Sequence, residues 1–169
     1  MIIIKSIILL LTFFVTTFLG LALANRYKNR VRDLKDIRNV LNILSTKIKY
    51  TYEPLPQIFS EISSEFTGGI AEIFKNSKEK MENMSAGEAW SFALEHSNTN
   101  MNSEDLNTLK KLENLLGKTD AEGQLSEIEL MKNYIEVQIE KAEKEQSKNE
   151  KLYKNLGVIV GLAIVIILL

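Results

Sequence analysis

Two uncharged apolar segments, one near each end of the sequence, constrain this chain most. Nineteen consecutive residues from Ser6 to Ala24 carry no charge, and neither do the fourteen residues from Leu156 to Leu169. As a helix rising about 1.5 Å per residue, the first segment nearly matches the roughly 30 Å hydrocarbon core of a bilayer. The second is short for a span, but basic residues just before it can lengthen it by snorkelling. We therefore predict two transmembrane helices, in residues 1–24 and 156–169.

Each apolar segment has an alternative interpretation. The first could be a cleaved signal peptide, because Ala22-Leu23-Ala24 resembles a small-residue cleavage site. Its apolar stretch is longer than a usual signal core, however, and the dense positive charge that follows resists export. The second could be a tail buried in a soluble core. Hydrophobicity on every side of that helix favours a membrane span instead.

Charge is distributed unevenly along the chain. Residues 1–50 carry nine basic and two acidic side chains, whereas the remainder carries twelve basic and twenty acidic side chains. Four basic residues between Arg26 and Arg32 follow the first apolar segment, and only Lys5 precedes it. Since positively charged flanks stay in the cytoplasm, we expect residues 25–155 to form a cytoplasmic domain. The acidic remainder argues against a nucleic-acid partner, which needs a basic face.

The middle of the chain predicts an all-α fold, a six-helix cytoplasmic bundle whose long first and last helices continue into the two transmembrane helices. Apolar residues spaced three and four apart form a seam on the first helix, at Leu34, Ile37, Leu41, Leu44 and Ile48. A matching seam on the last helix comprises Ile128, Met131, Ile135, Ile139 and Ala142. Because both helices meet the same bilayer, they must lie antiparallel, and we expect the two seams to pack together.

Four shorter helices are expected between these two. Pro54 and Pro56 should end the first helix and open the second, and Thr67-Gly68-Gly69 should separate the second from the third. Ser85 with Glu88 predicts a capping box at the start of the fourth helix. The fifth helix is leucine-rich and is expected to run up to a C-terminal glycine, Gly117.

No constellation of catalytic, cofactor-binding or metal-binding residues is apparent in the sequence. His96 is the only histidine and there is no cysteine, so these two residue types cannot form a metal site together. Gly68-Gly69 lacks the Lys-Ser or Lys-Thr that follows in a phosphate-binding loop. Trp90, the only tryptophan, is expected in the core. We therefore expect a protein that is not an enzyme and needs no cofactor.

Two glycines in the second apolar segment are candidates for membrane helix packing. Gly157 and Gly161 lie four residues apart, which places both on one helix face and allows another helix to approach closely. The alternative is an incidental spacing, because glycine is common in membrane helices.

Several short motifs resemble the stage III sporulation protein AB family of endospore-forming bacteria. They lie at Leu116-Gly117, Asp120, Gln124, Ile128, Glu150-Lys151-Leu152, Leu156-Gly157 and Gly161-Leu162. The size, the two terminal apolar segments and the Pro54-Leu55 step also match. The resemblance covers the whole chain and is most specific in its C-terminal portion, where we take Gly117, Asp120 and Gln124 as the family-motif residues.

That family is similar in turn to the cytoplasmic domains of the type II secretion platform protein F and its type IV pilus counterpart, which are six-helix bundles. Those domains have a pattern of a glycine-led helix, a Gly-Glu turn and a leucine-rich helix. A similar pattern occurs here at residues 87–94 and 117–125. The similarity is imperfect, because Lys118 stands where the turn usually has Glu. The platform proteins also have more membrane helices.

The resemblance implies a non-enzymatic scaffold in the channel between mother cell and forespore, located in the mother-cell membrane that surrounds the forespore. The implied partners are the membrane, a hexameric secretion-type ATPase (stage III sporulation protein AA) and other stage III channel proteins, and a homo-oligomer is compatible with this role. On the acidic last helix, Glu136, Glu140 and Glu143 are candidate docking residues for that ATPase, unless they only keep the helix soluble. The alternative function is a generic membrane-tethered stator or adaptor without an ATPase partner.

Overall fold

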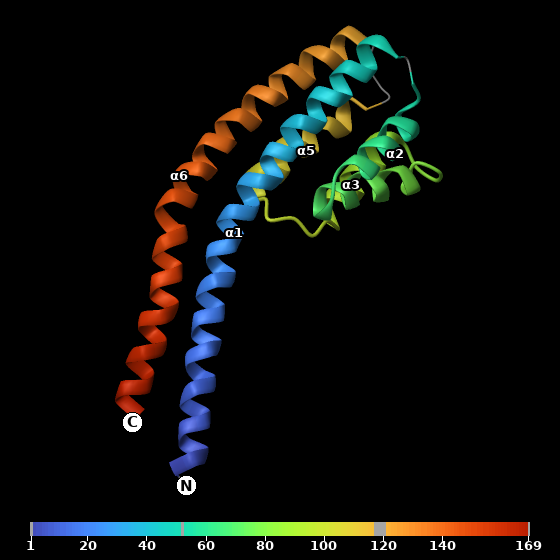
Figure 1. Cartoon of the computed structure of the whole chain (residues 1–169). Coiled ribbons are helices and arrows are strands. Elements are labelled where there is room, and N and C mark those ends of the chain that lie inside the picture. Colours follow the sequence, from blue (N-terminus) through green and yellow to red (C-terminus); the bar gives the residue numbers. More distant parts are fainter. Residues whose placement is uncertain (1, 52, 117–120, 169) are drawn as a thin grey trace. The chain divides into compact units, whose positions relative to one another are not determined.

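The computed structural model describes residues 2–51, 53–116 and 121–168, and within those ranges the chain is all-α, as predicted (Figure 1). Its elements are α1 (Ile2–Tyr50), α2 (Leu55–Glu65), α3 (Gly68–Lys80), α4 (Ala86–Glu95), α5 (Ser103–Lys110), the 3-10 turn η1 (Lys111–Asn114) and α6 (Ala121–Leu168). The six α-helices and the very long first and last helices confirm the fold class that the sequence predicts.

The chain divides into two compact units, which are described separately. The helix-pair unit consists of the N-terminal part of α1 and the C-terminal part of α6, residues 1–31 and 141–169. The bundle unit comprises residues 32–140. Both unit boundaries therefore fall inside the two long helices.

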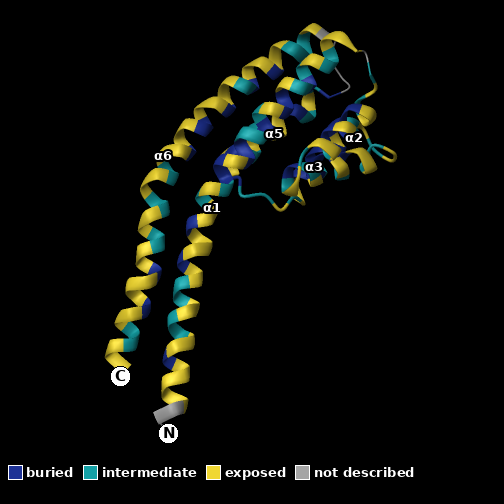
Figure 2. Ribbon diagram, in the orientation of Figure 1, coloured by how far each residue is buried: buried dark blue, intermediate teal, exposed yellow. Residues whose placement is uncertain are grey.

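The two predicted seams form much of the core of the bundle unit (Figure 2). Leu34, Ile37, Leu41 and Leu44 of α1 are buried, and so are Ile128, Met131, Ile135 and Ile139 of α6. Ile48, at the end of the first seam, is only half-buried. An ion pair between Arg38 and Glu136 joins the two helices, with Arg38 Nη1 3.2 Å from Glu136 Oε2. Periodic apolar residues on two long helices thus produce the buried faces that the sequence predicts.

An aromatic cluster joins the three short helices α2, α3 and α4. The Phe59 and Phe74 rings lie 4.9 Å apart edge to face, and Trp90 lies 5.2 Å from Phe74, measured between ring centroids. Trp90 is 1% exposed, and its indole Nε1 donates a hydrogen bond to the Leu109 carbonyl oxygen over 2.8 Å. Trp90 is therefore a core residue, as expected, and its single polar group is satisfied.

Local signals set several helix boundaries. Pro54 is the N-cap of α2, and the predicted capping box at α4 is present. In that box the Glu88 amide donates to Ser85 Oγ over 3.3 Å, while the Ser85 amide donates to the Glu88 carboxylate over 3.0 Å. These reciprocal bonds satisfy two amides that the first turn of a helix leaves without partners.

The fifth helix is shorter than predicted. The α-helical part of α5 ends at Lys110 and continues as the 3-10 turn η1, while Gly117, the expected stop, lies outside the described residues. A side chain at Gly87 of α4 would collide with the Glu113 carbonyl oxygen, so η1 packs its backbone directly on α4. Ser91 Oγ also donates to Glu113 Oε2 over 2.6 Å. The tighter turn is thus favoured by contacts with α4 that lie outside the local sequence.

Candidate functional site

The three acidic candidates for docking differ in their surroundings. Glu136 is half-exposed in the bundle unit and forms the ion pair with Arg38 described above. Glu140 lies at the end of the bundle unit and is exposed. Glu143 is also exposed but belongs to the helix-pair unit, and it has an interaction of its own. Among the three, Glu140 is the residue whose charge can be changed without breaking a known ion pair.

An exposed apolar stripe on α6 accompanies these acidic residues. It comprises Leu130, Tyr134 and Val137, which are 47%, 47% and 62% exposed. Their spacing of four and three residues places them on one helix face, beside the row that contains Glu136 and Glu140. Lys111 Nζ lies 5.0 Å from the centroid of the Tyr134 ring. We call this surface of α6, comprising Leu130, Tyr134, Val137, Glu136 and Glu140, the α6 outer face.

Sequence reasoning missed the apolar part of the α6 outer face. The signal was available, since Leu130, Tyr134 and Val137 form a second apolar row at helical spacing, on a different side of the helix from the core seam. Exposed apolar residues that occur singly need no explanation, but three on one face mark a candidate contact surface. The arrangement suits an apolar side chain of a partner, with basic groups beside it.

Glycine residues mark the closest approach of the two helices in the helix-pair unit. A Cβ atom added to Gly157 would lie 2.9 Å from Gly20 Cα and 2.9 Å from the Thr16 carbonyl oxygen. At Gly161 it would lie 2.9 Å from Phe13 Cδ2 and would also collide with the Thr16 hydroxyl. Both glycines therefore face α1, and any larger residue at Gly157 would push the two backbones apart.

Polar and aromatic contacts continue this helix pairing beyond the apolar segments. The Tyr27 and Tyr153 rings stack with centroids 5.7 Å apart, and a hydrogen bond between their side chains raises the pKa of Tyr27. Arg30, whose side chain is 7% exposed, lies 2.6 Å from Glu145. A buried guanidinium needs such a carboxylate, because an unpaired charge there would be costly.

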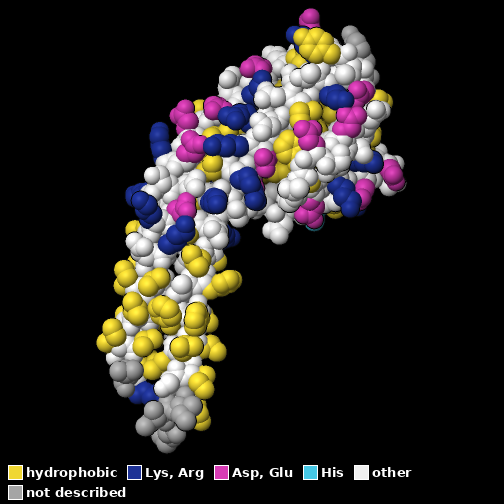
Figure 3. Space-filling view, in the orientation of Figure 1, with side chains coloured by type: hydrophobic (Ala, Val, Ile, Leu, Met, Phe, Trp, Pro, Cys, Tyr) yellow, Lys and Arg dark blue, Asp and Glu magenta, His cyan; other side chains and the backbone are white. Residues whose placement is uncertain are grey.

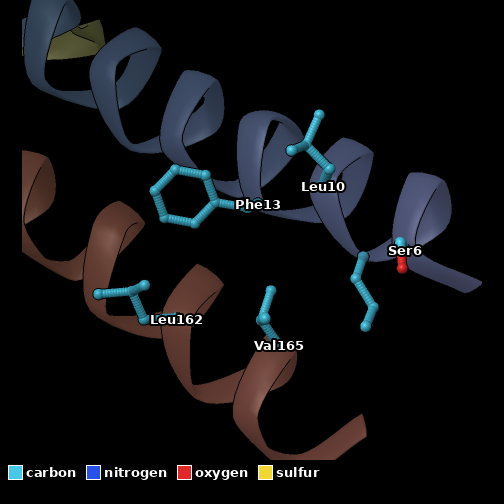
Figure 4. A pocket seen from close by; sticks show the side chains of 6 residues that line it. Ser6, Leu10, Phe13, Leu162 and Val165 are labelled. Atoms are coloured by element: carbon cyan, nitrogen blue, oxygen red, sulfur yellow. The ribbon is translucent and has the colours of Figure 1, made fainter. Parts of the chain in front are cut away.

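The apolar part of the helix pair contains an open pocket of about 270 Å³ (Figure 4). Figure 4 shows Ser6, Leu10 and Phe13 of α1 opposite Leu162 and Val165 of α6, and Leu9 completes the lining. With one hydroxyl among five apolar side chains, this pocket suits a hydrocarbon chain and offers little to a polar ligand.

Both long helices contain segments that are long and apolar enough to cross a membrane, judged by length and composition. Their most apolar windows have mean hydropathies of 2.5 and 1.9, and only 17% and 11% of those windows are buried. Figure 3 shows apolar side chains covering the surface of the helix-pair unit there. A soluble core helix would be mostly buried, so this surface is suited to lipid and supports a membrane protein.

A polar groove between α4 and η1 is another candidate pocket. It is lined by Asn83, Met84, Glu88, Ser91, Phe92, Glu95, Lys110 and Glu113. Its carboxylates all serve the fold: Glu88 in the capping box, Glu113 as the acceptor from Ser91, and Glu95 in a 2.7 Å ion pair with Lys110. The hydrogen bond from Lys110 lowers the pKa of Glu95. These partners give the acidic groups structural roles.

Histidine and acidic residues do not assemble into a metal centre in the described parts of the chain. His96 is exposed at the end of α4, where its Nδ1 lies 2.8 Å from the Phe92 carbonyl oxygen and its ring stacks on Phe92. Of the family-motif residues, Gly117 and Asp120 lie outside the described residues. Gln124 is half-buried in the first turn of α6 and is engaged in an interaction.

Together, the fold and these surfaces define an all-α bundle protein with two helices suited to crossing a membrane, whose exposed features suit contacts with proteins and lipids. The model of the stage III sporulation protein AB family matches residues 5–169, so the chain belongs to that family. It is 27% identical over 158 residues to the stage III sporulation protein AB of Bacillus subtilis (strain 168), covering 91% of this chain and 92% of that protein. A solved structure of a stage III sporulation protein AB has the same fold, with a TM-score of 0.65 and 22% identity, over 71% of this chain and 98% of that one.

Proposed function

We propose that the protein is a non-enzymatic membrane scaffold of the mother cell–forespore channel and that its bundle docks a hexameric secretion-type ATPase, stage III sporulation protein AA. Membership of the stage III sporulation protein AB family supports association with other stage III proteins. The single observation that supports docking is the α6 outer face, where an exposed apolar stripe runs beside exposed acidic side chains.

The chemistry of the α6 outer face suits a protein partner with an apolar anchor and basic neighbours. Tyrosine is enriched among the residues that dominate interface binding energy, and apolar contacts around such a residue exclude water from it. Acidic residues at the rim chiefly raise the association rate and set its salt dependence. Glu140 acts as such a rim charge in this proposal, together with Glu136 of the same unit, and Glu143 of the helix-pair unit is proposed as a separate docking residue.

The proposed topology places residues 1–24 and 156–169 in the outer forespore membrane, with the bundle of residues 25–155 in the mother-cell cytoplasm. Basic residues after the first apolar segment support this orientation. Gly157 and Gly161 then hold the two membrane helices together by close backbone packing, which is a common way for helices to associate in lipid.

Capture of the purified ATPase by the full chain in lipid nanodiscs tests the docking proposal. We expect capture by the wild type at about 50 mM salt, several-fold weaker capture by Val137→Asp, and weaker capture by Glu140→Lys that approaches the wild type as salt screens the charge. The exposed residue Glu72 of α3 provides the matched control, because Glu72→Lys makes the same charge change elsewhere on the bundle unit.

Each result bears on a different part of the proposal. Capture that is equal for Val137→Asp, Glu140→Lys and the control would exclude the α6 outer face while leaving an ATPase scaffold intact. A wild type that captures no ATPase at any salt concentration would favour the generic stator or adaptor. Retained helical circular dichroism in each variant shows that the fold has survived the substitution.

A further inference from the structure

We propose that the helix-pair unit carries a binding site for the phosphate headgroups of anionic phospholipids, formed by basic side chains of both long helices beside the apolar segments. This site consists of Arg26 and Lys28 of α1 with Lys148 and Lys151 of α6, and we call it the basic collar. All four residues are exposed. The inference rests on the proposed membrane insertion and is independent of ATPase docking.

Contacts in the helix-pair unit place Arg26 and Lys28 near the level of Lys151, with Lys148 about one helical turn further from the apolar segment. Tyr27, between Arg26 and Lys28, stacks on Tyr153, which follows Lys151 by two residues. The pKa of Glu150 is lowered by the hydrogen bond from Lys154 and also by the charge of Lys28 on the other helix. Figure 3 shows Lys and Arg side chains gathered directly beyond the apolar surface of this unit.

The charge balance of this region leaves a positive excess. Residues 25–31 contain three basic and no acidic side chains, and residues 141–155 contain five lysines and three glutamates. Two of the glutamates are paired within the unit, since Glu145 lies 2.6 Å from Arg30 and Glu150 lies 2.6 Å from Lys154, and Glu143 has an interaction of its own. The region therefore carries five more basic than acidic side chains, and the four members of the basic collar are exposed, with Lys28 also interacting electrostatically with Glu150.

The distance to the membrane is short enough for an electrostatic interaction with headgroups. At about 1.5 Å of helix rise per residue, Arg26 and Lys28 lie roughly 3 and 6 Å beyond Ala24, and Lys151 lies roughly 8 Å before Leu156. Lys148 lies roughly 12 Å away, and its long side chain can reach back towards the apolar segment. These separations are close to the Debye length of about 10 Å at 0.1 M salt.

Aromatic residues at the same level indicate where the headgroups lie. Tyrosine is enriched at membrane–water interfaces, because its ring is apolar and its hydroxyl is polar. The stacked pair of Tyr27 and Tyr153 thus marks the headgroup layer on both helices, with the basic collar around it. Juxtamembrane Lys and Arg residues at this depth attract anionic lipids and gain little from zwitterionic ones.

Lipid selectivity of the full chain tests this inference directly. The protein is reconstituted into phosphatidylcholine vesicles that contain spin-labelled phosphatidylglycerol or spin-labelled phosphatidylcholine, and the motionally restricted fraction gives their relative association. We expect the wild type to prefer phosphatidylglycerol by about fivefold or more, because each nearby basic residue contributes about that factor to attraction by an anionic surface. Replacing Arg26, Lys28, Lys148 and Lys151 with Gln should bring the preference close to one.

Matched controls distinguish an effect of the basic collar from an effect of the net charge of the protein. Replacing four exposed lysines of the bundle unit with Gln, at Lys49, Lys75, Lys78 and Lys111, should leave the preference unchanged. The two half-variants, Arg26→Gln/Lys28→Gln and Lys148→Gln/Lys151→Gln, should each remove part of it. An effect of only one half-variant would overturn a site shared by both helices.

Further outcomes distinguish a lipid headgroup from free phosphate as the ligand. They also distinguish failure of the lipid site from failure of membrane insertion. Inorganic phosphate at matched ionic strength should compete no better than chloride, and specific competition would point to a free-phosphate site instead. Equal association of both labelled lipids with the wild type would overturn the inference. Failure of the wild type to float with the vesicles would refute membrane insertion itself, and the lipid site with it.

Discussion

Arg38 of α1 and Glu136 of α6 form an ion pair across the bundle unit, with Arg38 Nη1 at 3.2 Å from Glu136 Oε2 and 3.4 Å from Oε1. Both side chains are partly exposed, at 36% and 50%, so water screens the attraction. This pair gives Glu136 a structural partner as well as a place on the α6 outer face. A charge reversal at Glu136 alone would therefore mix two effects, since it disturbs both the α1–α6 pairing and any partner contact.

A charge swap can separate these two roles of Glu136. We expect Glu136→Lys to destabilise the full chain in detergent by less than about 1 kcal/mol, because exposed ion pairs contribute about 0.2–1 kcal/mol. Adding Arg38→Glu should restore most of that loss by re-forming the pair in the opposite sense. Urea titration followed by circular dichroism measures both changes. If the double variant is no more stable than the additive expectation, the two side chains do not interact in solution.

The buried seam of α1 predicts a much larger effect at Leu41, which is 1% exposed. Leu41→Asp would place an unpaired carboxylate in the core, and we expect a loss of several kcal/mol or a strongly raised pKa for the new carboxyl group. The matched control is Asn42→Asp, because Asn42 is exposed on the same helix. Thermal melting of the full chain at neutral pH gives the comparison. An unchanged melting temperature for Leu41→Asp would show that this part of the seam is open to water.

The close glycine contact predicts that bulk at Gly157 separates the helix pair. A chain without native cysteine allows Tyr27→Cys and Tyr153→Cys to be joined by a short bifunctional thiol reagent. We expect efficient cross-linking in an otherwise unchanged chain, because these two residues stack on each other. Adding Gly157→Leu should reduce the yield several-fold, since its side chain would meet Gly20 and the Thr16 backbone.

The control for this experiment is Val158→Leu, which adds bulk at the next position on an exposed face of α6. Its cross-linking yield should equal that of the parent double-cysteine chain. Equal yields for Gly157→Leu and Val158→Leu would contradict a packing role for Gly157.

The sequence predicts those features that depend on the spacing of residues along one helix. Leu41 and Ile135 belong to rows with helical periodicity, and each row is buried because its helix needs a single apolar face. The capping box of Ser85 and Glu88 is similarly local, because its two partners are three residues apart. Such signals need no knowledge of where other helices lie.

Contacts between helices could not be predicted from the sequence in the same way. Gly157 was identified as a candidate, but its neighbour Gly20 was not, because the register between α1 and α6 depends on their packing. The shortening of α5 likewise depends on the approach of Glu113 to Gly87, which no pattern within α5 encodes. The Arg38–Glu136 pair has the same origin, since 98 residues separate its members. These features arise from tertiary packing, which overrides local propensity.

The orientation in the membrane gives the last prediction. Because basic residues follow the first apolar segment and only Lys5 precedes it, the bundle should lie in the cytoplasm. Asn98, between α4 and α5, and Ser147, on α6, are exposed and suit single cysteine replacements in a chain that has no cysteine. Neither Asn98→Cys nor Ser147→Cys should react with a membrane-impermeant thiol reagent in intact cells, and both should react after permeabilisation, which serves as the positive control.

Labelling of either position in intact cells would reverse the proposed topology. A mature protein that begins at Asn25 would instead show that the first apolar segment is a cleaved signal peptide, leaving α6 as the membrane anchor.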